Sequence, residues 1–147
     1  MCLQRRSELK GRSPTEPYRI VLADDHVLVR QGIKKIIQED PQMAVIGEAD
    51  DGLELLALLK ECRPDLVILD ISMPKMRGLE ATKRVKELCP GTKVLILTMH
   101  RSKEYLHQAL ANGADGYLLK EDADLALFSA IEAIRQGRVF ISPLLAG

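Results

Sequence analysis

The sequence predicts a doubly wound α/β fold, and three observations support this class. Short apolar runs alternate with longer stretches whose apolar residues recur at helical spacing, and five such pairs can be counted. Several of the runs are almost continuously apolar, which is typical of parallel strands covered by helices on both faces. With 147 residues and 46% apolar content, the chain can bury one core of ordinary size. We therefore expect a five-stranded parallel sheet with five helices and right-handed crossovers.

The alternating pattern occupies residues 18–137. Residues 1–17 are polar, are interrupted by Gly and Pro, and show neither helical nor strand periodicity, so we expect a flexible leader. Residues 138–147 follow the last helical stretch and contain Ser142 and Pro143. We expect them to begin a linker, so that one folded unit lies between two irregular ends.

The first helix should follow the strand that ends at Ala23. It should stop before Pro41, because proline disfavours helix in the residue before it. The second helix should begin at Asp51, since Glu54 three residues later completes a capping-box pattern, and Pro64 should end it. The side chains expected to face the sheet are Val29, Ile33, Ile36 and Ile37 in the first helix, and Leu55, Leu58, Leu59 and Cys62 in the second.

Three more helices complete the pattern. The third should extend from Arg77 to Leu88. Ser102 can cap the fourth, which should end near Asn112 and Gly113. The side chains expected to face the sheet are Ala81, Val85 and Leu88 in the third helix, Leu106, Ala109 and Leu110 in the fourth, and Leu127, Ala130, Ile131 and Ile134 in the fifth.

Four of the apolar runs end on polar residues that can act on a phosphoryl group. The first runs into Asp24 and Asp25, another runs into Asp70, and two more end at Thr98 and Lys120. Open α/β sheets bind ligands in a crevice outside the carboxyl ends of their parallel strands. If the four runs are neighbouring strands, three carboxylates, a hydroxyl and an ammonium group meet at one site.

The three carboxylates predict a magnesium site. Crowded negative groups repel one another, and a bound hard cation relieves the repulsion. Mg²⁺ suits such a site because it takes one or two carboxylates, keeps several waters and accepts further oxygens from a phosphate. A carboxylate beside the metal can then attack phosphorus and form an aspartyl phosphate. Lys120 would neutralise one phosphoryl oxygen, and Thr98 would donate a hydrogen bond to another.

Each of these residues also has a purely structural interpretation. Asp residues after a strand commonly accept local backbone hydrogen bonds in turns. A terminal Thr can bond its own loop, and a Lys is most often a solvated surface charge. Taken singly, none of the residues indicates a function. Their conjunction favours one charge-balanced site, because solvated loops rarely place complementary groups at four strand ends.

Charge and composition argue against several functional classes. Lys plus Arg and Asp plus Glu both total 21, so the net charge is zero and no overall field draws the chain to nucleic acid or to a membrane. No apolar stretch approaches the roughly 18 residues that span a bilayer. Cys2, Cys62 and Cys89 are odd in number and lack metal-ligand spacing, which favours reduced thiols and a cytoplasmic location.

Motifs at the strand ends carry a family resemblance. They are Asp24-Asp25-His26 with Arg30 and Gly32, Asp70-Ile71-Ser72-Met73-Pro74 with Gly78-Leu79-Glu80, Thr98, and Gly113-Ala114-Asp115-Gly116-Tyr117-Leu118-Leu119-Lys120. Together they resemble the receiver domain of two-component response regulators over about residues 18–137. The details are similar to the nitrate-regulator and nitrogen-fixation-regulator branch, whose LuxR-type output domain is a helix-turn-helix. The resemblance implies a flavodoxin-like fold with strand order 2-1-3-4-5.

The resemblance implies that Asp70 accepts a phosphoryl group from a phosphohistidine of a sensor histidine kinase. Asp25 and Asp70 would ligate Mg²⁺ together with the backbone carbonyl of Ser72, and Asp24 would act mainly through water. Many receivers carry Pro directly after the conserved lysine, and Glu121 stands there in this chain. We therefore do not expect a cis peptide at that position.

The resemblance also implies a switch. Thr98 and Lys120 would bind the phosphoryl oxygens, Thr98 would move toward the phosphate, and the ring of Tyr117 would turn inward. The face made by the fourth helix, the fifth strand and the fifth helix would change as a result. Tyr117 has an alternative as plain strand packing. Ser72 and His100 are placed to influence the lifetime of the phosphoryl group, with an exposed loop imidazole as the alternative for His100.

Two other functions stay open at this point. A haloacid-dehalogenase-like phosphatase also uses an aspartate nucleophile with Mg²⁺, but it needs a second Asp two residues after the nucleophile, where this chain has Ser72. A pseudo-receiver would bind partners without being phosphorylated. The sequence leaves the cognate kinase and homodimer formation undetermined, and we expect contact with DNA only through an output domain outside this chain.

Overall fold

The computed structural model describes residues 16–146, so the predicted leader, residues 1–17, lies almost entirely outside the described part. Within the described residues the strands form one parallel sheet in the order β2-β1-β3-β4-β5-β6. The strands are β1 (Tyr18–Ala23), β2 (Met43–Ala49), β3 (Leu66–Leu69), β4 (Lys93–Thr98), β5 (Gly116–Leu119) and β6 (Phe140–Ile141). The predicted α/β class and the order of the first five strands are therefore confirmed.

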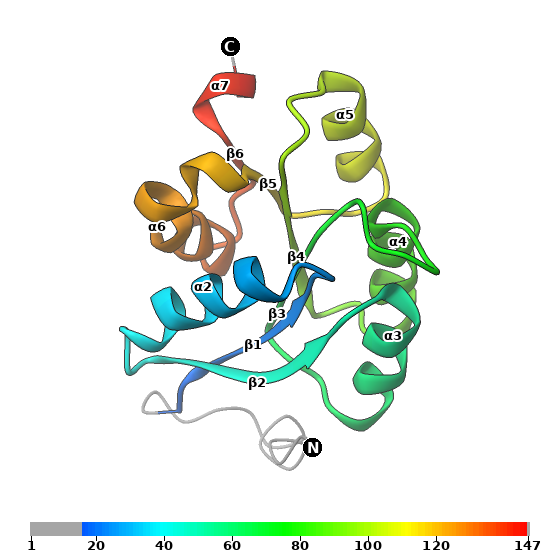
Figure 1. Ribbon diagram of the computed structural model, residues 1–147, viewed down its shortest axis with the longest axis vertical. Helices are drawn as coiled ribbons and strands as arrows, with labels where there is room; N and C mark the ends of the chain where they lie inside the picture. The colour runs from blue at the N-terminus through cyan, green and yellow to red at the C-terminus, as the bar shows by residue number, and fades with distance from the viewer. Residues whose placement is uncertain (1–15, 147) are drawn as a thin grey trace.

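Helices cover both faces of the sheet (Figure 1). They are α2 (Val27–Gln38), α3 (Gly52–Glu61), α4 (Gly78–Leu88), α5 (Lys103–Ala111), α6 (Ala123–Arg135) and the short α7 (Pro143–Ala146), with a 3₁₀ turn η1 (Lys120–Asp122) before α6. Helices α2 and α6 lie on one face, whereas α3, α4 and α5 lie on the other. Two helical layers thus enclose the sheet, as the almost continuously apolar strands predicted.

Alternation along β1 divides the core into two halves. Ile20 and Leu22 pack into the cluster under α2 and α6, while Val21 and Ala23 pack into the cluster under α3, α4 and α5. Successive strand side chains point to opposite faces. Because helices cover both faces of the sheet, every residue of this strand is buried. Full burial of an aliphatic side chain contributes about 1.5–3 kcal/mol to the stability of the fold. The well-packed central strands therefore form a stable base for the loops at their carboxyl ends.

Two of the predicted helix caps are present. The side chain of Asp51 accepts a hydrogen bond from the backbone N–H of Glu54 at 2.8 Å, at the start of α3. The Glu54 carboxylate accepts in return from the N–H of Asp50, one residue before the cap. Ser102 accepts from the N–H of Tyr105 at 3.1 Å and begins α5. These side chains satisfy backbone donors that the first turn of a helix leaves unpaired.

One predicted core residue is wrong. Leu88 is 40% exposed, whereas the neighbouring Cys89 is buried. The helix α4 ends at Leu88 and the backbone turns there, so the residue after the helix takes the inward position.

Thr82 is buried on this helix as well. Its hydroxyl donates to the carbonyl of Gly78 at 2.7 Å, which satisfies the polar atom inside the core.

The sheet has one strand more than the sequence analysis expected. Phe140 pairs with Gly116 and Ile141 pairs with Tyr117, which adds β6 beside β5. The Ser142 hydroxyl then accepts a hydrogen bond from the N–H of Leu119 at 2.8 Å. Two residues are too few to show alternation, so sequence periodicity could not reveal this strand. Whether residues 138–147 also begin a linker stays a prediction.

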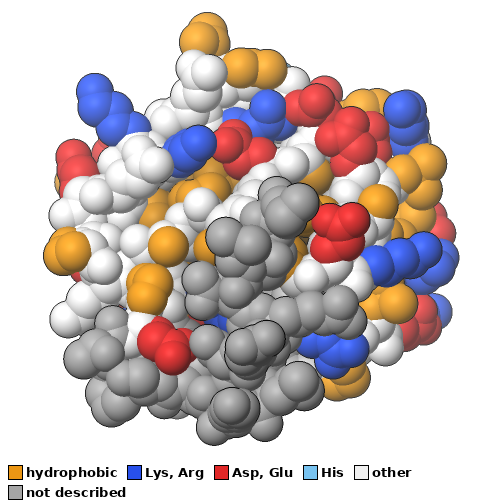
Figure 2. Space-filling model, turned by 90° about the horizontal axis from the view of Figure 1, so that it is seen from below, with side chains coloured by type: hydrophobic (Ala, Val, Ile, Leu, Met, Phe, Trp, Pro, Cys, Tyr) orange, Lys and Arg blue, Asp and Glu red, His pale blue; other side chains and the backbone are white. Residues whose placement is uncertain are grey.

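The surface carries charges of both signs. On the described part of the face in Figure 2, Lys and Arg side chains are interspersed with Asp and Glu side chains and with single apolar residues. This mixture matches the net charge of zero in the sequence. Among residues 16–146, no helix has both the length and the apolar character that a membrane crossing requires.

Candidate functional site

The parallel register brings the predicted strand ends to one edge of the sheet. Ala23 of β1 pairs with Leu69 of β3, and Leu69 pairs in turn with Ile96 of β4. Thr98 of β4 pairs with Leu119 of β5. The polar residues at and just beyond these ends therefore leave the sheet close together, which is the arrangement that the sequence predicted.

Three acids, a histidine and a lysine form the centre of the site. Asp24 and Asp70 are buried, and Asp25 is exposed. One potential ligand atom from each of Asp24, Asp25, His26 and Asp70 lies within 4.8 Å of the others. The Lys120 ammonium lies 3.0 Å from Oδ2 of Asp24 and 3.6 Å from Oδ2 of Asp70. The predicted acidic cluster and its balancing cation thus come together.

The Asp70 carboxylate is held in an unfavourable environment for its charge. Burial raises the pKa of Asp70, the nearby ammonium of Lys120 opposes this rise, and the negative charge of Asp24 adds to it. The buried Oδ2 atom of Asp70 has no hydrogen-bond partner among the described residues. Leaving a buried acceptor unpaired is costly. A hard cation or a phosphoryl group at this oxygen would remove that cost, so the donor set fits the predicted metal.

The exposed His26 contacts all three acids, which the sequence analysis did not predict. Its ring atom Nδ1 lies 3.0 Å from Asp24 Oδ1, 3.5 Å from Asp25 Oδ1 and 3.8 Å from Asp70 Oδ2. Its backbone N–H also donates to Asp24 Oδ1 at 2.8 Å. The signal in the sequence was its position directly after Asp25, but adjacency alone does not show which way a side chain points.

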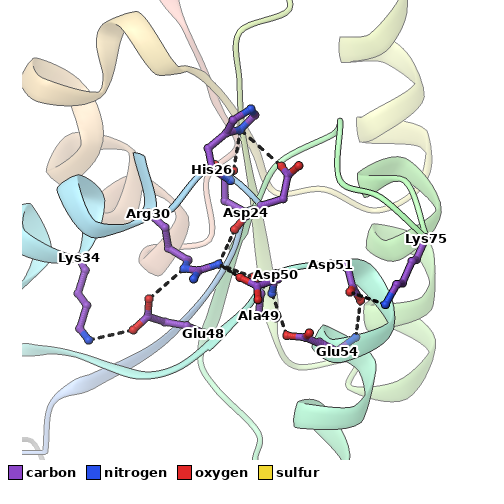
Figure 3. Close-up of polar contacts among 11 residues, drawn as sticks. Asp24, His26, Arg30, Lys34, Glu48, Ala49, Asp50, Asp51, Glu54 and Lys75 are labelled. Atoms are coloured by element: carbon purple, nitrogen blue, oxygen red, sulfur yellow. Dashed lines mark hydrogen bonds and ion pairs between the residues drawn. The ribbon is translucent and has the colours of Figure 1, made fainter. Parts of the chain in front are cut away.

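Arg30 is a second residue whose place the sequence did not reveal. Its guanidinium lies beneath the acidic turn, where it donates to the carbonyl of Asp24 and to residues at the end of β2 (Figure 3). Further along the same rim, the Lys75 ammonium lies 3.5 Å from a carboxylate oxygen of Asp51. Ion pairs and hydrogen bonds therefore line the side of the site formed by β1, β2 and α3.

His100 connects several of the predicted site residues. Its backbone N–H donates to Oγ1 of the buried Thr98 at 3.1 Å. Its ring atom Nε2 lies 2.9 Å from Oγ of Ser72, and its ring meets that of Tyr105 edge to face with 5.1 Å between centroids. His100 is thus exposed, and its contacts link the loop after β4 to the loop after β3 and to α5.

A cavity of about 270 Å³ opens beside this histidine. Its lining combines apolar and polar side chains, namely Ile71, Ser72, Met73, Arg77, His100 and Tyr105. The cavity shares the loop after β3 with the phosphoacceptor candidate Asp70. The structure therefore leaves room on this side of the loop for water or for part of a phosphate donor.

Tyr117 is fully buried in β5. Its hydroxyl donates to the backbone carbonyl of His100 at 2.8 Å, and burial raises the pKa of Tyr117 to about 12. The ring packs in the core cluster under α3, α4 and α5. The ring therefore shows the strand packing that was the alternative interpretation of Tyr117, whereas its switch role stays a prediction.

Gly78 lets α4 begin directly against the loop after β3. A Cβ atom at this position would lie 2.3 Å from the carbonyl oxygen of Asp70 and 2.6 Å from Cα of Ile71. The N–H of Gly78 donates to the Ile71 carbonyl at 2.9 Å. Only a residue without a side chain permits this approach, so the glycine fixes the loop that carries Asp70.

An ion pair bridges the two remaining loops. Arg101, in the loop after β4, donates to both carboxylate oxygens of Glu121. Glu121 follows Lys120, and the described residues contain no cis peptide bond, in agreement with the expectation for this position. The pair ties the loop that follows Thr98 and carries His100 to the turn that carries Lys120.

Comparison with known proteins agrees with this geometry. The response regulator receiver domain family matches residues 20–132. The transcriptional regulatory protein DegU of Brevibacillus brevis is 41% identical over 126 residues, which are 85% of this chain and 53% of that protein. The chain thus spans about half the length of the curated relatives it matches.

Two solved structures show the same likeness. A LuxR-family response regulator from Aurantimonas is 38% identical with a TM-score of 0.85, covering 89% of this chain and 94% of that one. A structure of two RcsB dimers bound to two DNAs is 28% identical with a TM-score of 0.83, covering 89% of this chain and 66% of that one. This chain belongs to the response regulator receiver domain family, whose members are signalling switches rather than turnover enzymes.

Proposed function

We propose that Asp70 is the phosphoacceptor of this receiver and takes its phosphoryl group from a phosphohistidine of a sensor histidine kinase. One observation carries the proposal. Oδ2 of Asp70 is buried without a hydrogen-bond partner among the described residues, yet it lies 3.6 Å from the Lys120 ammonium and beside two further acids. The nucleophile Asp70, its counterion Lys120 and the acids that could bind a metal therefore lie around one site that could hold a phosphoryl group.

The transfer step follows from this arrangement. A carboxylate oxygen of Asp70 attacks phosphorus and forms an O–P bond, while the P–N bond of the phosphohistidine breaks and the imidazole leaves with the electron pair and takes up a proton. Burial raises the pKa of Asp70, which makes its carboxylate more basic than one in water. Lys120 balances the negative charge that the phosphoryl group brings to the buried carboxylate.

The residues fit Mg²⁺ as the cation. Asp25 and Asp70 supply carboxylate oxygens, the backbone carbonyl of Ser72 is the third protein ligand that we propose, and Asp24 acts mainly through water. When bound, the ion neutralises phosphoryl oxygens and orients them for in-line transfer. The carboxylates, crowded within 4.8 Å of one another, support a hard cation in preference to a soft one.

Thr98 and Tyr117 form the switch in this proposal. The Thr98 hydroxyl oxygen accepts a hydrogen bond from the N–H of His100, and its own O–H can donate to a phosphoryl oxygen. Movement of Thr98 would carry the loop after β4 with it through the N–H of His100, and Tyr117, which donates to the carbonyl of His100, would be affected in turn. Two or three charge-assisted hydrogen bonds of about 1.5–3 kcal/mol each match the roughly 5.5 kcal/mol that inverts a two-state equilibrium from 1:99 to 99:1.

Ser72 and His100 set the lifetime of the phosphoryl group in this proposal. Their side chains are bonded to each other at 2.9 Å, and both line the cavity beside the loop after β3. Together they limit how water approaches the aspartyl phosphate. Replacing His100 by alanine should change the rate of spontaneous dephosphorylation, whereas replacing His107, which lies exposed on α5, should not. Equal rates in both variants would remove His100 from this role.

The output of the switch lies outside this chain. DegU carries the name of a transcriptional regulatory protein, and RcsB binds DNA as dimers. We infer that the complete protein joins this receiver to a helix-turn-helix domain that controls transcription, and that contact with DNA belongs to that domain. Formation of a homodimer on phosphorylation would connect the receiver to that domain, and RcsB is seen as dimers bound to DNA.

A labelling experiment tests the proposal. The chain is incubated with acetyl phosphate and Mg²⁺, and its mass is measured before and after, followed by fragmentation to locate the added group. We expect one phosphoryl group on Asp70, no labelling of Asp70→Asn, and no labelling when EDTA removes the metal. Labelling elsewhere, or persistence in Asp70→Asn, would contradict the assignment.

The same experiment distinguishes the two alternatives from the sequence. Many turnovers of small phosphate esters would indicate a phosphatase, and the absence of any labelling or of any response to beryllium fluoride would indicate a pseudo-receiver. A stoichiometric, metal-dependent phosphoryl group supports the receiver function and disfavours both.

A further inference from the structure

Arg30 occupies a position under the acidic turn that the proposed phosphotransfer does not use. It lies on α2, its side chain is 13% exposed, and its guanidinium points toward the ends of β1 and β2 (Figure 3). No carboxylate oxygen of Asp24, Asp25 or Asp70 is among its partners in the described structure. Its contact with the metal cluster is made through the backbone instead.

The guanidinium connects three segments of chain. Nη1 donates to the carbonyl of Asp24 at 2.6 Å and to the carbonyl of Ala49 at 3.2 Å. The same atom donates to a carboxylate oxygen of Asp50, and Nε donates to Glu48 at 3.0 Å. One planar group therefore holds the end of β1, the end of β2 and the loop before α3 in a single arrangement.

The contact with the Asp24 carbonyl has a direct consequence for Asp25. That carbonyl belongs to the peptide group joining Asp24 to Asp25, and a peptide group is planar. A hydrogen bond that fixes the carbonyl therefore fixes the plane in which the nitrogen of Asp25 lies. Together with the φ angle of Asp25, the same bond restricts the direction in which the Asp25 side chain leaves the backbone.

Repulsion makes such a restraint necessary. Asp24, Asp25 and Asp70 bring three carboxylates within reach of one another, and like charges at short distance favour turning one of them away. The turn that carries two of them has a free side toward solvent, where Asp25 is already exposed. A donor that holds the backbone of this turn opposes the movement without occupying a carboxylate oxygen that the cation needs.

We propose that Arg30 is a positioning residue for the cation site and acts by holding the Asp24–Asp25 peptide in the orientation that directs the Asp25 carboxylate toward Asp70. This inference rests on the proposed Mg²⁺-dependent function. Outer partners that orient metal ligands typically contribute 10-fold to 100-fold in metal affinity, which sets the size of the effect to expect.

The direction in which Mg²⁺ affinity changes distinguishes a positioning role of Arg30 from an effect of its charge. A guanidinium near an acidic cluster repels a divalent cation, so removing the charge alone would strengthen Mg²⁺ binding. Loss of the hydrogen bond that holds the Asp24–Asp25 turn would weaken Mg²⁺ binding. The acidic partners of Arg30, which are Glu48 and Asp50, already offset much of its charge, so the positioning effect should dominate.

Lys34 provides a matched control. It lies one helical turn after Arg30 on α2 and shares the partner Glu48, with Nζ at 2.9 Å from the second carboxylate oxygen. It has no hydrogen bond to the Asp24–Asp25 turn among the described residues. Lys34→Met therefore removes one positive charge from the same ion-pair network and leaves the restraint on the turn in place.

The test measures Mg²⁺ binding by isothermal titration calorimetry in the wild-type chain, Arg30→Met, Arg30→Lys and Lys34→Met, after circular dichroism has shown that each is folded. We expect the dissociation constant to rise about 10-fold or more in Arg30→Met and to change less than about two-fold in Lys34→Met. Arg30→Lys keeps the charge but lacks the planar fork of donors, so it should also bind more weakly.

Phosphorylation by acetyl phosphate gives an independent measurement. If Arg30 positions the metal ligand, its variants should need more Mg²⁺ for half-maximal labelling of Asp70 and should approach the wild-type rate when Mg²⁺ is saturating. A purely structural loss would lower the rate at every Mg²⁺ concentration.

Each result has a defined meaning. Unchanged or tighter Mg²⁺ binding in a folded Arg30→Met variant overturns the inference. If Arg30→Met does not fold, an Arg30→Lys variant that binds Mg²⁺ with wild-type affinity overturns it instead. Failure of the wild-type chain to bind Mg²⁺ would instead contradict the proposed function, so the two failures are distinguishable.

Discussion

The phenolic hydroxyl of Tyr117 donates a hydrogen bond of 2.8 Å to the backbone carbonyl of His100. The bond joins a fully buried side chain of β5 to an exposed loop after β4. The N–H of the same His100 donates to the hydroxyl oxygen of Thr98, so one loop residue is bonded to both of the proposed switch residues. A change at Thr98 is therefore coupled to Tyr117 through a single peptide segment.

Tyr117→Phe should lower the free energy of unfolding by about 0.5–1.5 kcal/mol, the usual net contribution of one hydrogen bond. The ring would keep its packing, so a larger loss is not expected. Urea denaturation followed by circular dichroism measures the difference. Tyr105→Phe is the control, because the Tyr105 hydroxyl has no hydrogen bond in the part of the chain that the structure describes. Equal losses in both variants would argue against a special role of the Tyr117 bond.

The raised pKa of Tyr117 predicts an alkaline limit to stability. Its pKa is about 12 in the folded chain and about 10 in an unfolded one. The resulting contribution to stability is fully present below pH 10 and is lost as the pH rises toward 12. Absorbance at the tyrosinate wavelength should show one late-titrating group in the wild-type chain. That component should be missing from Tyr117→Phe.

Asp70→Asn should increase the free energy of unfolding at neutral pH in the presence of EDTA. Burial raises the pKa of Asp70, so folding favours its protonated form and the charged carboxylate destabilises the native state. Because this pKa is raised, the penalty is absent below the pKa of the unfolded chain and develops as the pH rises through the folded value. The wild-type and variant stabilities should therefore converge as the pH falls. A variant less stable than wild type at pH 7 would contradict the environment described for Asp70.

Gly78→Ala should destabilise the chain by about 1–3 kcal/mol, the usual cost of overpacking. The added methyl group would lie 2.3 Å from the Asp70 carbonyl, so the loop that carries the phosphoacceptor must move. Phosphorylation should slow as well. Gly32→Ala is the matched control, since a Cβ there meets no atom within 4 Å and Gly32 lies within α2. That variant should gain up to about 1 kcal/mol in stability.

Mg²⁺ should raise the stability of the wild-type chain. A ligand that binds only the folded state stabilises it by about 2.7 kcal/mol at 100 times its dissociation constant. Thermal denaturation with increasing Mg²⁺ measures this shift. Asp25→Asn should reduce the shift because it removes one proposed ligand, whereas Asp65→Asn, at the opposite end of β3 from Asp70, should retain it. A wild-type chain insensitive to Mg²⁺ would contradict the metal site.

Much of the fold followed from local pattern. The strands from β1 to β5 were visible because buried parallel strands are almost continuously apolar, and the helices were visible because their apolar residues recur at i, i+3 and i+4. The caps at Asp51 and Ser102 were predictable because they depend on residues three apart. Leu88 was assigned wrongly to the core, since periodicity does not show where the backbone turns at the end of a helix.

The candidate site was predictable for a similar reason. Asp24, Asp25, Asp70, Thr98 and Lys120 each stand at or just beyond the end of an apolar run, and the geometry of parallel strands converts that position into proximity. His26 and Arg30 could not be placed in this way. Their positions depend on side-chain direction and on contacts between segments far apart in the chain.

The sequence alone determined which residue types meet at the carboxyl edge of the sheet, because strand ends and helix faces are encoded by spacing along the chain. Only the tertiary structure decided that Tyr117 binds the His100 carbonyl, that Phe140 and Ile141 extend the sheet, and that Arg30 holds the acidic turn. These features depend on directional hydrogen bonds between distant segments, and no periodic pattern in the sequence specifies the direction of such bonds.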